Sequence, residues 1–195
     1  MQTTLNAIRK CSPCISGWNT LLKSLNKTKA DDEPLELSYI LQSNGLDDAI
    51  WCLKAVDGKD KEIRLFAVWC ARQVQHLMKD PRSIAALDIA EKFALGLTSE
   101  EALRDAAAAA SYADAAAYAY ADAAAYAAAY AADAAYYTAA AYAASAAADA
   151  AYYTAAVSAV SAASAAANAA YTSSREKQAK EFLRMCKGTK VQSTK

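Results

Sequence analysis

Cysteine is the residue type in this sequence with the clearest potential for chemistry. Cys11 and Cys14 stand in the segment CSPC, a spacing that occurs in redox-active pairs and in zinc sites. A redox pair of this kind needs a βαβ context, and a zinc site needs two further ligands at matching spacing. The sequence offers the following further candidates: His76, Cys52, Cys70 and Cys186. Cys52 and Cys70 fall on apolar helical faces and are interpreted as packing residues, so we predict no metal ion or other cofactor.

Catalysis has little support elsewhere in the chain. His76 is the only histidine, and no neighbouring residue supplies a partner for nucleophilic or general-base work. The carboxylate pairs Asp47/Asp48 and Glu100/Glu101 stand at expected helix starts, where capping explains them. No glycine-rich phosphate loop occurs. We therefore predict a protein without enzymatic activity, with an enzyme that uses the CSPC segment or His76 as a third alternative.

The charge balance and the hydropathy of the chain indicate which classes of partner it does not bind. The 195 residues include 21 Lys and Arg and 21 Asp and Glu, so no global field favours nucleic acid or an anionic membrane. The first residues lack the apolar core of a signal peptide, and polar residues interrupt the alanine tract too often for a membrane span. Five cysteines without a regular framework agree with a reducing compartment. We expect a cytoplasmic protein that binds neither nucleic acid nor membrane.

Apolar residues recur at helical spacing through the first hundred residues. The predicted helices cover residues 17–27, 34–44, 46–56, 60–78 and 81–95. In the helix over 60–78 an apolar stripe runs from Ile63 to Leu77, and Leu65, Val68 and Trp69 widen it enough for two neighbours to pack against it. We therefore place this helix at the centre of the fold.

Capping residues mark several helix ends. Expected starts are Pro34, Asp80 with Pro81, Thr98 with Glu101 in a capping box at the beginning of the alanine tract, and Ser173 with Glu176 in a second box at a final helix. Gly45, Gly96 and Gly188 suit left-handed endings. On the final helix we expect one buried face, made of Ala179, Phe182, Leu183 and Cys186.

The alanine-rich tract is predicted to be helical. Between Gly96 and Gly188 there is neither glycine nor proline, and alanine has the highest helix propensity. A single rod over residues 98–172 would be roughly 110 Å long, whereas a compact domain of this length has a radius of gyration of about 16 Å. We therefore predict several antiparallel helices. Their candidate starts are Asp114, Asp133 and Asp149.

The octapeptide DAAYYTAA occurs twice in this tract, at residues 133–140 and 149–156. On one straight helix the second copy would face about 160° away from the first, so two copies with the same role need a break between them. The alternative is that the repeat arose by duplication of a low-complexity stretch, in which case either face is acceptable.

Alanine also determines how closely these helices can pack. Methyl side chains let helix axes approach, and tyrosine rings can fill the grooves that are left. The predicted fold class is all-α, a multi-helical bundle with tightly packed Ala/Tyr-rich antiparallel helices in the C-terminal half. Its segments are an N-terminal helical segment and linker over 1–33, a helical domain over 34–97, the Ala/Tyr-rich helices over 98–172, and a C-terminal helix with a basic tail over 173–195.

The tyrosines of the tract act either as spacers between helices or as an exposed contact surface. Uncharged apolar surface marks a contact site, and tyrosine offers large area at low entropic cost. The candidate partner-binding residues are Tyr118, Tyr126, Tyr130, Tyr137, Tyr142 and Tyr153. The partner would be another protein or a second copy of the chain.

A family resemblance is carried by residues 46–110. This stretch contains the segments FAVWCARQV and DPRS, a short helix ending in Gly96, and a threonine-capped acidic start of the alanine tract. In these features the chain resembles the alanine-rich helical immunity proteins of bacteria and their phages. The resemblance implies binding and neutralising a toxin, and it supplies no catalytic residues. We therefore predict a non-enzymatic, immunity-like or phage-encoded inhibitor of a protein partner; the alternative is a structural or self-assembling helical protein.

Overall fold

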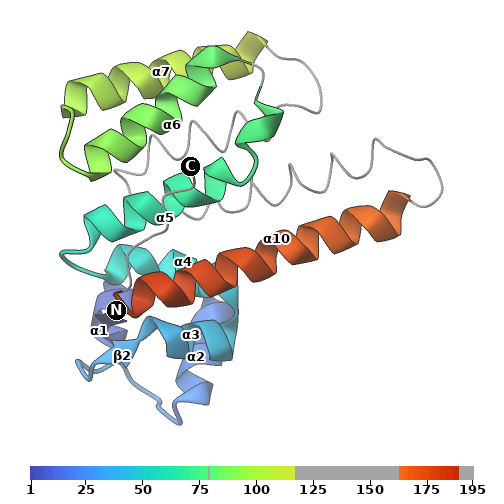
Figure 1. Cartoon of the computed structure of the whole chain (residues 1–195). Helices are drawn as coiled ribbons and strands as arrows, with labels where there is room; N and C mark the ends of the chain where they lie inside the picture. The colour runs from blue at the N-terminus through green and yellow to red at the C-terminus, as the bar shows by residue number, and fades with distance from the viewer. Residues whose placement is uncertain (79, 117–162, 189–195) are drawn as a thin grey trace.

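The protein is built almost entirely of helices (Figure 1). The computed structural model describes residues 1–78, 80–116 and 163–188, and the structural statements below refer to these residues. They are 72% helical, which confirms the predicted all-α class. The α-helices are α1 Leu5–Lys10, α2 Ile15–Ser24, α3 Leu37–Asn44, α4 Leu46–Trp51, α5 Asp60–Arg72, α6 Pro81–Ala94, α7 Glu100–Ala116 and α10 Ala163–Cys186. The 3-10 helices are η1 Cys52–Ala55 and η2 Gln75–Leu77, and the two short antiparallel strands are β1 Gln2–Thr3 and β2 Leu35–Glu36.

Helix α5 contributes to two hydrophobic cores, as its broad apolar stripe predicted. Ile63, Phe66 and Cys70 belong to an N-terminal core that also contains residues of α1 to α4 and of α10. Val68 and Ala71 belong to a second core, which forms with α6 and α7. In Figure 1, α5 lies between the α6/α7 pair and α10. The predicted central position of this helix is therefore confirmed.

Helices α6 and α7 form a hairpin that packs through small side chains. Ala86 and Ala90 of α6 and Ala107 and Ala110 of α7 are buried in one cluster, where methyl groups allow close approach. The turn depends on Gly96, whose φ of +74° lets α6 end in a Schellman motif. In that motif the Gly96 amide donates to the Phe93 carbonyl and the Leu97 amide to the Lys92 carbonyl, at 2.9 and 2.8 Å.

Helix α10 closes the N-terminal core with its C-terminal half. Phe182 is fully buried, and its ring meets Phe66 edge-on with ring centroids 5.8 Å apart. Gln178 and Met185 are buried on the same face. The amino group of Met1 donates to the carbonyl of Cys186 at 2.6 Å. The end of α10 is thus held by elements from the opposite end of the chain.

Two predicted boundaries in the first half of the chain are wrong. Pro34 does not start a helix, because the next two residues pair with β1 and α3 begins only at Leu37. The helix predicted over 60–78 ends at Arg72, whose guanidinium binds Asp88 and Glu91 of α6 at 2.8 and 2.7 Å. These contacts tie the end of α5 to α6, and the chain turns between the two helices through η2.

The cap of the alanine tract lies one residue later than predicted. The hydroxyl of Ser99, and not that of Thr98, accepts a hydrogen bond from the amide of Ala102 at 3.2 Å. Since the third helical position is then alanine, the predicted reciprocal bond from Glu101 has no counterpart. Asp114 is not a helix start either, because α7 continues through it to Ala116. The candidate starts Asp133 and Asp149 and both copies of the octapeptide lie outside the described residues.

The predicted break before Ser173 is absent, because α10 runs through this residue from Ala163. Ser173 is exposed, so its hydroxyl does not need the backbone as a partner, and the preceding alanines favour helix. The buried face is also rotated from the predicted one. Ala179 and Leu183 are half-buried, whereas Gln178, Glu181 and Met185 are buried beside Phe182 and Cys186.

Truncating Phe182 tests the role of α10. We expect Phe182→Ala to lower the free energy of unfolding by about 3–5 kcal/mol, because the change opens a cavity against Phe66 in a fully buried site. Urea denaturation followed by circular dichroism measures the change. Tyr171→Ala, an exposed aromatic truncation on the same helix, should stay within about 0.5 kcal/mol. Equal effects of the two variants would show that α10 does not close the core.

A second pair of variants tests the observed helix cap. Ser99→Ala should lower the free energy of unfolding by about 1 kcal/mol, since the Ala102 amide loses its side-chain acceptor. Thr98→Ala should change it by less than about 0.5 kcal/mol. The same urea titration measures both variants. A larger loss of stability for Thr98→Ala than for Ser99→Ala would show that Thr98 is the cap.

Candidate functional site

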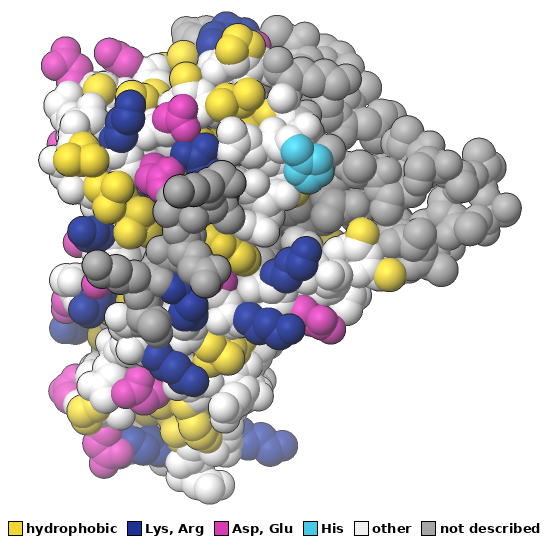
Figure 2. Space-filling view, in the orientation of Figure 1, with side chains coloured by type: hydrophobic (Ala, Val, Ile, Leu, Met, Phe, Trp, Pro, Cys, Tyr) yellow, Lys and Arg dark blue, Asp and Glu magenta, His cyan; other side chains and the backbone are white. Residues whose placement is uncertain are grey.

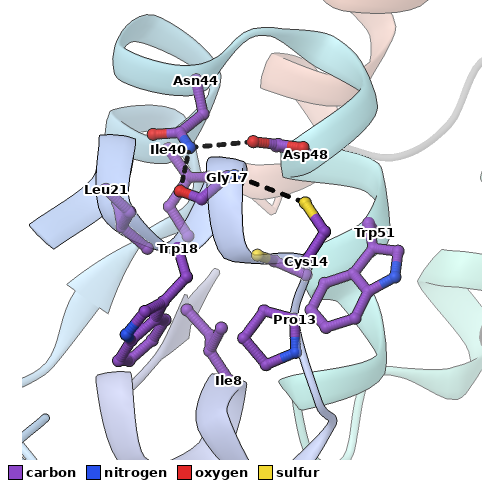
Figure 3. Close-up of a pocket in the computed structure, with 11 residues that line it drawn as sticks. Ile8, Pro13, Cys14, Gly17, Trp18, Leu21, Ile40, Asn44, Asp48 and Trp51 are labelled. Carbon is purple, nitrogen blue, oxygen red and sulfur yellow. Dashed lines mark hydrogen bonds between the residues drawn. The ribbon is translucent and has the colours of Figure 1, made fainter.

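A pocket of about 110 Å³ lies where α1, α2, α3 and α4 meet (Figure 3). Its walls are mainly apolar. Ile8 of α1, Leu21 of α2 and Ile40 of α3 are among the lining residues. Trp18 and Trp51 flank the pocket from opposite sides in Figure 3. The pocket is therefore a hydrophobic slot bordered by two indoles.

The start of α2 places a sulfur atom at this pocket. Cys14 is the N-cap of α2, and its Sγ accepts a hydrogen bond from the Gly17 amide at 3.3 Å. The side chain is exposed and lines the pocket, so the slot opens to solvent here. The Ser16 hydroxyl and then the Gly17 amide lower the pKa of the Cys14 thiol, because both hydrogen bonds stabilise the thiolate; desolvation and Asp48 oppose them.

Glycine at position 17 allows a close approach of two polar groups. A Cβ there would lie 2.7 Å from Oδ2 of Asp48 and 3.1 Å from Sγ of Cys14. The side chain of Asn44 fixes the carboxylate, since its Nδ2 donates to Asp48 Oδ2 and to the Gly17 carbonyl, each at 2.8 Å. Asp48, Asn44 and Cys14 thus form one polar end of an otherwise apolar slot, as Figure 3 shows.

Two neighbouring side chains add to the character of this region. The ammonium of Lys54 lies 3.8 Å from the centroid of the Trp51 ring, a cation–π contact. Ile15, the first residue of α2, is 80% exposed, the highest value among the large hydrophobic side chains that the structure describes. A strongly apolar side chain therefore stands in water next to the mouth of the pocket.

The cysteines singled out from the sequence have separate surroundings. All five are free. The Cys11 thiol donates to the Lys54 carbonyl at 3.7 Å, whereas Cys14 caps α2. Cys52 and Cys70 are buried as predicted, and burial raises the pKa of Cys52 to about 12 and also raises that of Cys70. Within the described ranges, no three His, Cys, Asp or Glu side chains are grouped so as to hold a metal ion.

The other candidate residues are scattered. His76 lies on η2 and is exposed, as the histidine colour in Figure 2 shows. Asp47 and Asp48 occupy the first turn of α4, and Glu100 and Glu101 that of α7, which confirms that these pairs stand at helix starts. Sequence reasoning missed the second role of Asp48 at the pocket, because the contact with Gly17 and Asn44 depends on how α2, α3 and α4 pack.

The partner-binding residues predicted from the sequence are six tyrosines of the alanine-rich tract. Tyr118, Tyr126, Tyr130, Tyr137, Tyr142 and Tyr153 all lie outside the described residues. Acidic and basic side chains are interspersed over the face seen in Figure 2. In the parts of the chain that are described, no helix combines the length and the apolar character that crossing a membrane requires.

Comparison of the chain with known protein families, with curated proteins and with solved structures finds no match. The resemblance to immunity proteins therefore stays a prediction from the sequence. The pocket and the exposed start of α2 are the features from which a function can be argued.

The pKa of Cys14 yields a test of the site. We expect iodoacetamide to alkylate Cys14 before Cys52 and Cys70 in the folded protein, because the thiolate is the nucleophile and the latter two thiols are buried. As the pH is raised, the rate of Cys14 alkylation should reach its plateau at a lower pH than the rate for an ordinary thiol. Timed quenching and peptide mass spectrometry measure the rate at each cysteine.

Removing the Ser16 hydroxyl should move this profile. Ser16→Ala is expected to shift the pH dependence of Cys14 alkylation upward, since Ser16 is the main cause of the lowered pKa. Thr20→Ala removes a hydroxyl that bonds the Ser16 carbonyl within the same helix and should leave the profile in place. Alkylation of Cys14 at the rate and pH dependence of a free thiol would contradict the described cap.

Proposed function

We propose that this chain is a non-enzymatic protein that binds and inhibits another protein, in the way that its resemblance to immunity proteins implies. The contact surface in this proposal is the α2 tip surface, which comprises Pro13, Cys14, Ile15 and Trp18. Five free cysteines suit a reducing compartment, so we place the encounter in the cytoplasm.

The exposure of Ile15 is the observation that carries the proposal. An isoleucine that is 80% exposed contributes little to the stability of its own fold. Single exposed hydrophobic residues are common on proteins, so exposure alone would not mark a contact site. Ile15, however, adjoins the half-buried Pro13 and Trp18 at the mouth of a hydrophobic pocket. Interface hot spots are enriched in tryptophan and lie in pockets that lose their water on binding, and Trp18 supplies such a residue at the pocket next to Ile15.

The arrangement also supports binding through its rigidity. The Cys14 cap and the Asn44 hydrogen bonds hold the start of α2 against α3 and α4. A surface that is ordered before the encounter loses less conformational entropy when it binds. The α2 tip surface is therefore better suited to recognition than a loop of similar composition.

Self-assembly is the second candidate, and one observation favours it. Leu95 and Leu97, at the turn between α6 and α7, are 44% and 71% exposed. Paired apolar side chains at a hairpin tip can bind a second copy of the chain. The α2 tip surface adjoins a described pocket, so we place this second surface behind it.

Affinity capture from the source cells, followed by reconstitution with the purified captured protein, tests the proposal. Ile15→Ala should weaken the reconstituted complex by about ten-fold or more, as truncation of a hot-spot side chain does. Thr20→Ala, a truncation at an exposed position of the same helix that lies on a different face from Ile15, should leave the affinity unchanged. Isothermal titration calorimetry gives both dissociation constants.

Two outcomes would contradict the proposal. A complex whose affinity is insensitive to Ile15→Ala would exclude the α2 tip surface. A large uniform particle formed by the chain alone, detected by light scattering and dissolved by Leu97→Ser, would favour self-assembly.

A further inference from the structure

The polar end of the pocket contains a carboxylate, that of Asp48, which is held by hydrogen bonds from a neutral amide. Oδ2 of Asp48 and Sγ of Cys14 converge on Gly17, at 2.7 and 3.1 Å from the position of its absent Cβ. The Asn44 amide that holds the carboxylate is neutral. No ion pair joins Asp48 to a Lys or Arg within the described part of the chain, whereas Asp47 next to it binds Arg175. A ligand that covers this end must therefore supply a hydrogen-bond donor or a positive charge to the Asp48 carboxylate.

The walls next to this carboxylate are suited to a cation on an apolar stem. Trp18 and Trp51 flank the slot, so their rings can pack against the methylene groups of a stem whose charge lies at Asp48. Trp51 already binds one ammonium, that of Lys54, and Lys54 is not among the residues that line the pocket. Because the Trp51 ring already holds this cation, the ammonium of an occupant is assigned to Asp48 and not to the indole.

The volume of the slot limits the shape of the occupant. It measures about 110 Å³, whereas an apolar cavity of about 150 Å³ accommodates benzene. A slim alkyl chain fits this space better than an aromatic ring. The occupant with these properties among protein side chains is lysine, which has four methylene groups and a terminal ammonium.

We propose that the pocket binds a lysine side chain of the partner protein, with its methylene groups between Trp18 and Trp51 and its ammonium at Asp48. The inference rests on the proposed function, since it names the group that the partner presents. Cys14 lies beside the ammonium position and adds negative charge whenever it is a thiolate.

A purely apolar occupant is the competing interpretation. Leucine or norleucine would also fill the slot, but it would cover the Asp48 carboxylate without supplying a donor. Removing a charged group from water without a partner is costly, and this cost selects against an apolar side chain. The two occupants therefore differ in their dependence on the charge at position 48.

Titration of the full chain with amino-acid amides tests the inference without the partner. The probes are Nα-acetyl-lysine amide and the uncharged Nα-acetyl-norleucine amide, and the readout is the indole N–H signals in ¹H–¹⁵N correlation spectra. The chain has three tryptophans. The signals of Trp18 and Trp51 should shift with the lysine probe and saturate at a dissociation constant of about millimolar, while Trp69, outside the pocket, serves as the internal control.

Variants separate charge from shape. Asp48→Asn keeps the size of the side chain and should weaken binding of the lysine probe about ten-fold or more, because a charged hydrogen-bond partner is lost. Asp57→Asn removes a charge at an exposed position outside the pocket and should have no effect. Gly17→Ala, which favours helix, places a methyl against Asp48 and Cys14 and should also weaken binding.

Three results would overturn the inference. These are equal affinity of the lysine and norleucine probes, unchanged affinity of Asp48→Asn, and the absence of a saturable shift at Trp18 and Trp51. None of them affects the proposed function, which is judged by the dependence of the partner complex on Ile15. Conversely, the partner complex could be insensitive to Ile15→Ala while the lysine probe still binds. That result would exclude the proposed contact surface, and with it a lysine supplied by the partner, and the pocket would then be a site for free alkylammonium ligands.

Discussion

The packing of α10 onto α5 is the contact on which the rest of the structure depends. Phe182 has no exposed surface and meets Phe66 across the N-terminal core, while α10 also contacts α3 and α4. These two helices carry Asn44, Asp48 and Trp51, so the elements behind one side of the pocket are themselves supported by α10. The ion pair between Arg175 of α10 and Asp47 of α4 adds to this support. The side chains of the candidate site therefore come from the N-terminal helices, but their positions depend on a helix from the far end of the chain.

The residue that caps α2 is not the type that would stabilise the start of this helix most. Cysteine is a weaker N-cap than serine, threonine, aspartate or asparagine, because sulfur is a poor hydrogen-bond acceptor. Cys14 nevertheless caps α2, and the same atom lines the pocket beside Asp48. A serine would cap the helix better but would present a smaller and harder group to a ligand. Cys14 therefore serves both as the cap of α2 and as part of the pocket wall.

The sequence was a good guide where local chemistry decides the outcome, and a poor one where distant segments meet. Asp80 with Pro81 at the start of α6 and Gly96 at its end were predicted from side-chain chemistry alone, and both are confirmed. Pro34 failed as a helix start because β1 pairs with the residues that follow it, and this pairing is not visible locally. Ser173 failed because an alanine-rich helix can continue through a residue that would cap it elsewhere. For the site, CSPC was singled out for its spacing, whereas the role of its second cysteine as a cap and its closeness to Gly17, Asn44 and Asp48 arise only through the cap geometry and tertiary packing.

The position of α5 between two cores has a consequence for dissecting the protein. Its Phe66 side faces the N-terminal helices and α10, and its Val68 side faces α6 and α7. A fragment that keeps α5 but loses one neighbouring layer would expose the apolar face of α5 that packs on that layer. A fragment without α5 would expose the apolar residues that α5 covers. Shortened versions of the chain should therefore be designed to keep α5 together with both layers that it joins.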